Sequence, residues 1–220
     1  MIELRNPYPE VLMGGTLSYG GNQMQAEGRT MQQCGCGIVA ALDLSWYLKR
    51  YHSIPATDWQ LVPTPLREYN EKLALLNRQY FPLIPRLGIN GLLLVAGINR
   101  MFQKEAISYR AKWVISGNRL WERVREMLLQ DLPVIMSVGP NFPAVWQKNR
   151  LDFYRRLPSG EYRKAAATTA HYVTATGIDD EWLKISSWGK QYYINRKEYK
   201  EYVKKHSTYL FSNIVYLEKR

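Results

Sequence analysis

The sequence is poor in cysteine and histidine: two cysteines, Cys34 and Cys36, and three histidines occur in 220 residues. Two thiols so close together exclude the disulfide framework that holds small secreted domains together. A Cys-x-Cys zinc site is disfavoured, because zinc sites usually have wider spacing and four ligands, and the histidines lie far away in sequence. We therefore expect neither a cofactor nor a bound metal.

Long apolar runs are also missing. No segment approaches the roughly 20 apolar residues that a membrane-spanning helix needs. The first ten residues, MIELRNPYPE, carry charges where a signal peptide needs an apolar run. The chain as given therefore predicts a cytoplasmic protein without a transmembrane segment.

Acidic residues are outnumbered, with 19 Asp and Glu against 30 Lys and Arg, which gives a formal net charge of +11. Such a surface attracts anionic partners at long range, and acidic peptides are one class of them. The basic residues are scattered, however, and neither a recognition helix nor an RNA-binding fingerprint is present. Solvated faces of a basic protein explain this charge more simply than a nucleic-acid site does.

The length suits one sizeable core, and we expect a single domain over residues 1–220. Its first half, to about residue 105, is predicted to be helical, and its second half, from about 106, rich in antiparallel strands. This is an α+β layout. From residue 36 to 51 apolar residues cover most sides of a predicted helix, which is typical of a buried helix. The other predicted helices cover 66–79, 91–103, 118–130 and 196–205, and the predicted strands 108–115, 133–138, 153–157, 170–177, 182–186, 191–194 and 209–217.

Cys36 is the candidate nucleophile. It falls in the first turn of the predicted buried helix, where unpaired N–H groups and the helix dipole stabilise a thiolate. Cys34 falls two residues earlier, in what reads as the approach loop. The alternative is a small buried cysteine that only packs.

A thiolate of this kind needs a base, and His171 is the best candidate. His52 falls sixteen residues after Cys36 on the same predicted helix, which is roughly 24 Å at 1.5 Å per residue. His206 ends a lysine-rich segment and is expected to be exposed. His171 opens the predicted strand AHYVTATGI after a run of small residues. A hydrogen-bonded core histidine is the alternative.

Ser186 is the candidate third group, which would orient the imidazole. It ends the next predicted strand, LKISSWG, fifteen residues beyond His171 and one hairpin away. Trp188 would then cover the pair. A strand end with a packed tryptophan is the simpler interpretation of this segment.

Two blocks, CGCGIVAALDL and HYVTATGIDDEWLKISSWG, resemble the papain-like cysteine peptidases. In that family a cysteine opens a central helix, and a histidine strand and an Asn-Ser-Trp-Gly motif follow much later. The segment KWVISGNRLWERVREMLLQDLPVIMSVG is similar in style to the bacterial branch of bacteriocin-processing, double-glycine peptidases. The resemblance covers about residues 20–194. It implies Cys36 as nucleophile, a catalytic dyad with His171, and a papain-like fold.

The sequence departs from the family at two site positions. Ser186 stands where the family has Asn or Asp, and Asp179 or Asp180 could substitute for it. Thr30 stands where the family has the glutamine of the oxyanion hole. Gln23 and Gln33 are the two best substitutes, ahead of Gln25 and Gln32. Together with the Cys36 backbone N–H, one side-chain amide would complete the hole.

These residues predict a cysteine peptidase-like hydrolase that cleaves a peptide or amide bond through an acyl-enzyme. Two alternatives remain open. One is an acyltransferase or small-molecule amidase with the same thiol, and the other is a non-catalytic adaptor that kept the fold. Reactivity of the thiol and cleavage of peptides distinguish the three.

Overall fold

The computed structural model describes residues 1–52, 63–114, 116–139 and 149–220. Its contacts divide the chain into two compact units. The helical unit comprises Asn6–Lys112, Ser187–Lys190 and Leu217–Arg220, and the strand-rich unit comprises Met1–Arg5, Trp113–Ser186 and Gln191–Tyr216. The expectation of one domain stays a prediction.

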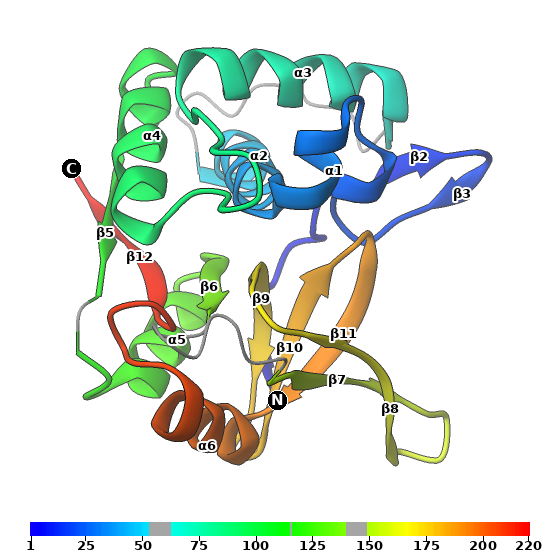
Figure 1. Ribbon diagram of the computed structural model, residues 1–220, viewed down its shortest axis with the longest axis vertical. Helices are drawn as coiled ribbons and strands as arrows, with labels where there is room; N and C mark the ends of the chain where they lie inside the picture. Colours follow the sequence, from blue (N-terminus) through cyan, green and yellow to red (C-terminus); the bar gives the residue numbers. More distant parts are fainter. Residues whose placement is uncertain (53–62, 115, 140–148) are drawn as a thin grey trace. The chain divides into compact units, whose positions relative to one another are not determined.

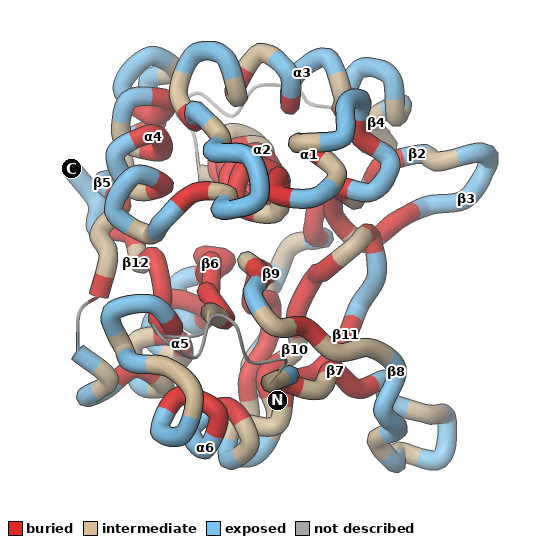
Figure 2. The backbone as a smooth tube through the Cα atoms, in the orientation of Figure 1, coloured by how far each residue is buried: buried red, intermediate tan, exposed pale blue. Residues whose placement is uncertain are grey.

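Helix α2 (Cys36–His52) is the core of the helical unit. Ile38, Leu44 and Leu48 on this helix are almost completely buried. The helix packs against α1, α3 and α4 (Figure 1), and most of its residues are buried (Figure 2). The predicted buried helix is therefore confirmed, and Cys36 is its first residue.

The helices around α2 follow amphipathic patterns. Helix α3 (Leu66–Gln79) and helix α4 (Gly91–Lys104) each bury an apolar face and expose the opposite side of the helix (Figure 2). The Asn90 side chain caps α4 by accepting a hydrogen bond from the Leu93 amide. The predicted spans 66–79 and 91–103 agree with these helices to within one residue.

The first 35 residues build a small sheet and two short helices. Strand β2 (Val11–Met13) pairs antiparallel with β3 (Thr16–Leu17) and parallel with β4 (Thr64–Pro65). A 3-10 helix, η1 (Gln23–Gln25), precedes helix α1 (Arg29–Cys34). The expectation that Cys34 lies in an approach loop was wrong, because Cys34 ends helix α1.

The strand-rich unit contains most of a large sheet, whose strand order is β5-β12-β6-β9-β10-β11-β7-β8. The strands are β5 (Tyr109–Trp113), β6 (Val134–Val138), β7 (Leu151–Arg156), β8 (Tyr162–Thr168), β9 (His171–Ile178), β10 (Trp182–Ser187), β11 (Lys190–Asn195) and β12 (Ile214–Lys219). Strand β1 (Ile2–Glu3) pairs with the end of β9. Mixed helices and antiparallel strands confirm the predicted α+β composition.

Two strand predictions need correction. Strand β8 was not predicted, because its sequence YRKAAAT lacks apolar alternation and lies at the edge of the sheet. Strand β12 begins at Ile214 instead of residue 209, because Phe211 and Ser212 donate their amides back to the Thr208 carbonyl in a turn. The predicted end of β5, Ile115, lies outside the described residues.

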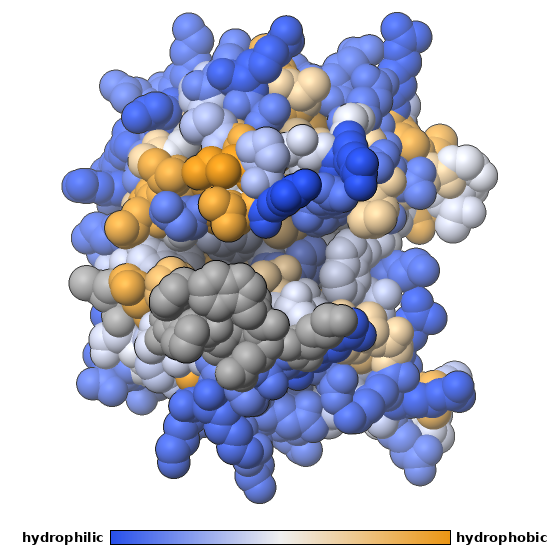
Figure 3. All heavy atoms as spheres, in the orientation of Figure 1, coloured by the Kyte–Doolittle hydropathy of each residue, from blue (hydrophilic) through white to orange (hydrophobic). Residues whose placement is uncertain are grey.

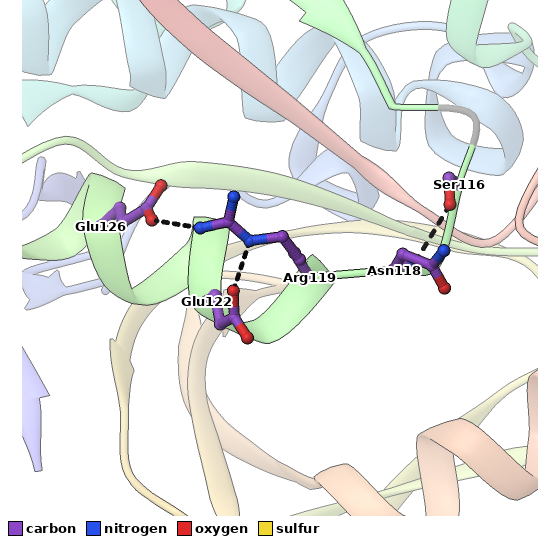
Figure 4. A network of polar contacts seen from close by, with 5 residues as sticks. All are labelled: Ser116, Asn118, Arg119, Glu122 and Glu126. Carbon is purple, nitrogen blue, oxygen red and sulfur yellow. Dashed lines mark hydrogen bonds and ion pairs between the residues drawn. The ribbon is translucent and has the colours of Figure 1, made fainter.

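Helix α5 (Leu120–Leu129) begins two residues after the start of the predicted helix 118–130. The N-cap is Arg119, in the left-handed conformation with φ 61°, and no side chain caps the helix. The Asn118 amide instead donates to Ser116 Oγ, and Arg119 pairs with Glu122 and Glu126 (Figure 4). Exposed ion pairs of this kind hold the helix start only weakly.

Candidate active site

Cys36 opens α2 and is partly exposed, whereas Cys34 is buried at the end of α1. Neither thiol is in a disulfide. The Gly35 carbonyl accepts the amides of Ile38 and Val39, so the helical hydrogen bonds of α2 begin immediately before Cys36. The first amides of a helix have no acceptor within the helix and favour negative charge nearby. The helix start and the partial exposure of Cys36 both suit a nucleophilic thiol.

The junction between α1 and α2 is tightly packed at Gly35. The Gly35 amide donates to the Met31 carbonyl, and a β-carbon at position 35 would lie 2.3 Å from Met31 Sδ. Only glycine fits this turn without displacing its neighbours. The two helices therefore meet at a fixed point next to Cys36.

Gln23 is buried and is tied to the helix that precedes Cys36. Its Nε2 donates to the Gln32 carbonyl at 2.8 Å, and Gln32 Nε2 in turn donates to the Ala26 carbonyl at 2.9 Å. Asn22 caps η1 by accepting from the Met24 amide. An amide NH₂ group carries two hydrogens, so the bond to Gln32 leaves one hydrogen of Gln23 for another acceptor.

The structure places the other candidate glutamine differently. Gln33 lies on α1 and is exposed to solvent. Among the described residues, its side chain has no hydrogen bond comparable to the one that Gln23 donates to the Gln32 carbonyl. Of the two candidates for the oxyanion hole, Gln23 is the one with a defined position in the helical unit.

The end of the SSWG segment belongs to the helical unit and binds the segment that leads to Gln23. The Tyr19 amide donates to the Gly189 carbonyl, and the Gly189 amide donates to the Gly21 carbonyl, both at 2.9 Å. Gly189 has φ 70°, and a β-carbon there would lie 3.2 Å from the β-carbons of Ser18 and Asn22. The Trp188–Gly189 turn therefore packs directly against residues 18–23, which we call the glutamine segment because it ends with Gln23.

Asp43 is a buried ionisable residue that the sequence prediction missed. Its Oδ2 accepts from the Gly21 amide at 3.0 Å and from Tyr8 Oη at 3.4 Å, and its Oδ1 accepts from Tyr69 Oη at 2.8 Å. Burial raises its pKa to about 7, and the three hydrogen bonds act in the opposite direction. An aspartate within the apolar helix sequence AALDLS was the signal that could have revealed it.

His171 opens β9 in the strand-rich unit. It lies opposite Val138 of β6, and its ring is 6.5 Å from that of Phe153, centroid to centroid. The side chain is buried, and burial lowers its pKa to about 3. The imidazole is therefore neutral at neutral pH, which is the form that accepts a proton.

Ser186 lies on the neighbouring strand, as predicted from the hairpin. The register places it opposite Thr174, three residues along β9 from His171, so the two are not directly opposite. Both Ser186 and Ser187 are buried. The role of Ser186 in orienting His171 stays a prediction.

The two aspartates considered as substitutes for Ser186 have other roles. Asp179 Oδ1 accepts the amides of Glu181 and Trp182 at 2.9 and 2.6 Å, so it shapes the hairpin turn. The side chain of Asp180 is fully exposed and pairs with Arg125. Neither is placed as an orienting group for an imidazole.

His52 lies where the sequence predicted, whereas His206, which was expected to be exposed, is half-buried. His52 is the last residue of α2, and its Nδ1 lies 3.2 Å from Tyr109 Oη. His206 ends helix α6 (Arg196–His206). Within the helical unit, the only described histidine is thus at the far end of the helix that begins with Cys36.

The surface of the helical unit has an exposed apolar patch and a pocket. Gly88 packs on Cys34, since a β-carbon at 88 would lie 3.6 Å from the Cys34 carbonyl oxygen. Figure 3 shows an apolar patch on the surface, and the segment around Gly88 exposes Ile84, Leu87, Leu92 and Leu93. A pocket of about 280 Å³ lies elsewhere, along the part of α2 that begins at Leu42.

Among the described residues, no helix is both long enough and apolar enough to cross a bilayer. In the same part of the chain, no three His, Cys, Asp or Glu side chains gather as metal ligands would.

Comparisons with known proteins give little further information. No family model and no curated protein matches the chain. One solved structure, provisionally described as a C39-like peptidase from Bacillus anthracis, shares 14% identity at a TM-score of 0.48. The alignment covers 96% of this chain and 98% of the other.

Proposed function

We propose that this protein is a papain-like thiol hydrolase in which Cys36 attacks a peptide or amide carbonyl and His171 takes the thiol proton. The observation that carries the proposal is the partly exposed thiol on the first residue of a buried 17-residue helix. Functional cysteines are found in such settings, whereas buried structural cysteines such as Cys34 are inert.

The reaction would proceed by acyl transfer. As the sulfur bonds to the carbonyl carbon, the thiol proton passes to the neutral imidazole of His171. The C–N bond then breaks, and the imidazolium returns the proton to the leaving amine. In the second half of the reaction, water attacks the thioester carbonyl while His171 takes its proton. The C–S bond then breaks, and the imidazolium returns the proton to the Cys36 sulfur.

The electrostatics favour a particular timing of the proton transfer. Because burial lowers the pKa of His171 to about 3, a resting thiolate–imidazolium pair is disfavoured. Proton transfer would then accompany the attack, and the oxyanion would form at the start of α2. The Cys36 amide and the Gln23 side chain are the donors we propose for it.

A peptide substrate is supported by the surface near Cys36. The patch formed by Ile84, Leu87, Leu92 and Leu93 offers apolar contacts next to the α1–α2 junction. Leu87 has 78% of its surface exposed. The net charge of +11 adds a general attraction for acidic peptides.

Alkylation and acylation of single variants test this proposal. We expect iodoacetamide to label Cys36 in the wild type and in Cys34→Ser, and to leave Cys36→Ser unlabelled. A p-nitrophenyl ester should form a thioester on Cys36, and His171→Ala should slow this step at least a hundredfold. Labelling confined to Cys34, or acylation that is unchanged by His171→Ala, would refute the proposal.

A non-catalytic adaptor with the same fold is the second candidate, and the burial of His171 favours it. An imidazole that is hard to protonate is a weak base, and serine orients a histidine less firmly than asparagine or aspartate does. The same experiment separates the two functions, because an adaptor would show ordinary thiol reactivity and form no thioester. A thioester that reacts with amines faster than with water would instead indicate an acyltransferase.

A further inference from the structure

We propose that Asp43 is a positioning residue for the oxyanion site, because its carboxylate fixes the segment that carries Gln23 to the helix that carries Cys36. This inference rests on the proposed function, since it concerns the same acyl-transfer site. It adds a residue that neither the family resemblance nor the sequence motifs point to.

The first step is the position of Asp43 on α2. It follows Cys36 by seven residues, and two turns of an α-helix bring such residues onto the same face. The rise places the two about 10 Å apart along the helix axis, at 1.5 Å per residue. Asp43 is buried at 2% exposure, so it faces protein and not solvent.

The second step is the contact between Asp43 and the glutamine segment. The Gly21 amide donates to Asp43 Oδ2 at 3.0 Å, and Gly21 lies two residues before Gln23. A β-carbon at position 21 would lie 1.9 Å from Tyr69 Oη, so the backbone approaches the carboxylate and the phenol directly. The bond therefore fixes the main chain itself and not a mobile side chain.

The third step is what Gly21 holds in turn. Its carbonyl accepts the Gly189 amide, and Asn22 caps the short helix that begins with Gln23. Gln23 then bonds to the Gln32 carbonyl of α1, whose end leads through Gly35 to Cys36. A continuous series of contacts thus connects Asp43 on α2, through Gly21, Gln23 and α1, to Cys36 at the start of α2.

The charge of Asp43 determines how many of these hydrogen bonds its carboxylate can accept. Three donors converge on the carboxylate: the Gly21 amide, Tyr8 from the N-terminal segment and Tyr69 from α3. Among the described residues, these three are the groups that shift its pKa by hydrogen bonding, and no cation is one of them. A neutral acid would turn a hydroxyl toward one donor, so one contact would have to rearrange. The ionised carboxylate accepts all three hydrogen bonds, and Asp43 ionises near pH 7 because its pKa is raised to about 7.

The test compares two reagents that react with the same sulfur. Acylation by p-nitrophenyl acetate creates an oxyanion, whereas alkylation by iodoacetamide creates none, so only acylation depends on the oxyanion site. In the full-length protein at pH 8, we expect Asp43→Asn to slow acylation at least tenfold and to change alkylation by less than twofold. The double variant with Gln23→Ala should be no slower than Gln23→Ala alone, because both act on one contact. A purely structural defect would slow both reagents.

Asp131→Asn is the matched control. Asp131 is also a buried aspartate that accepts a backbone amide, that of Arg5 at 2.7 Å, but it lies in the strand-rich unit. Asp131→Asn should leave the rates of acylation and of alkylation unchanged. The pH profile adds a second readout, because an ionisation near pH 7 in the wild-type acylation rate should vanish in Asp43→Asn.

The outcomes separate the inference from the proposed function. If wild type acylates through Cys36 and Gln23→Ala is slow, but Asp43→Asn matches wild type, then the positioning role is wrong and the hydrolase stands. Equal slowing of both reagents, or multiplied effects in the double variant, also overturns it. A wild type that forms no thioester rejects the hydrolase, and the inference with it. Should Asp43→Asn not fold, Tyr69→Phe must slow acylation three- to tenfold with alkylation unchanged.

Discussion

Tyr69 donates a hydrogen bond from α3 to the buried carboxylate of Asp43 on α2, with 2.8 Å between Oη and Oδ1. Both side chains are almost completely buried. Desolvation and the neighbouring carboxylate raise the pKa of Tyr69 well above its usual value, so the phenol stays a donor. This pair connects the two helices, and the Gly21 backbone packs so closely against it that a β-carbon at position 21 would lie 1.9 Å from Tyr69 Oη.

The lack of space at Gly21 gives the first prediction. Gly21→Ala should destabilise the protein by about 2 kcal/mol or more, because the new methyl group would overlap the Tyr69 ring and displace it from Asp43. Chemical denaturation measures this loss. Gly139→Ala is the control, since a β-carbon there would meet its neighbours at 3.6 Å or more. Equal stability of the two variants would show that the contact at Gly21 yields easily.

Asp43 gives a prediction about pH. Its pKa is raised from 3.8 to about 7 in the folded protein, so between these values the folded state keeps a proton that the unfolded state has lost. Stability therefore falls as pH rises through this range, by up to about 4 kcal/mol at 1.36 kcal/mol per pKa unit. Asp43→Asn lacks this loss. The stability of wild type relative to Asp43→Asn should thus be highest below pH 4, and a flat difference would contradict the raised pKa.

His171 gives the opposite slope. Its pKa is lowered from 6.5 to about 3, so between these values the unfolded state binds a proton that the folded state refuses. Stability is therefore lost as pH falls below 6.5, by up to about 5 kcal/mol. His171→Gln removes this acid sensitivity. Unfolding measured from pH 7 to pH 4 should show wild type losing stability relative to His171→Gln, and parallel curves would mean that the imidazole charges freely.

The buried helix predicted from the apolar pattern, with Cys36 at its start, is confirmed by the structure. Apolar residues on nearly every side of 36–52 leave no alternative to a buried helix, and the prolines after α2 limit where α3 can begin. The same pattern places Cys36 at the helix start. For the same reason His52 falls at the far end of that helix.

Elements held by tertiary contacts were missed. Helix α1 follows Gly28, which has φ 85° and caps nothing through a side chain, so no N-terminal signal marks it. Strand β8 has the weak composition that an edge strand tolerates. Both elements are formed through their neighbours: α1 through Gln23 and η1, and β8 through its pairing with β7.

The site was predictable only in part, for a physical reason. Motifs identify residues by type and order, and the proposal of Cys36, His171 and the SSWG segment as site residues rests on such motifs. The role of Asp43 depends on a main-chain amide 22 residues away and on two phenols from other elements. No local pattern contains such a convergence, although an aspartate in an apolar helix indicates that a partner exists.

The left-handed residue at the start of α5 gives the last prediction. Arg119 has φ 61°, a conformation that costs an L-residue about 1 kcal/mol and costs glycine almost nothing. Its ion pairs with Glu122 and Glu126 are exposed and each contribute little. Because Arg119→Gly and Arg119→Ala both lose these pairs, their difference isolates the backbone. We expect Arg119→Gly to be more stable than Arg119→Ala by about 1 kcal/mol in urea denaturation. The reverse order would mean that the helix start relaxes to a right-handed conformation once the arginine is gone.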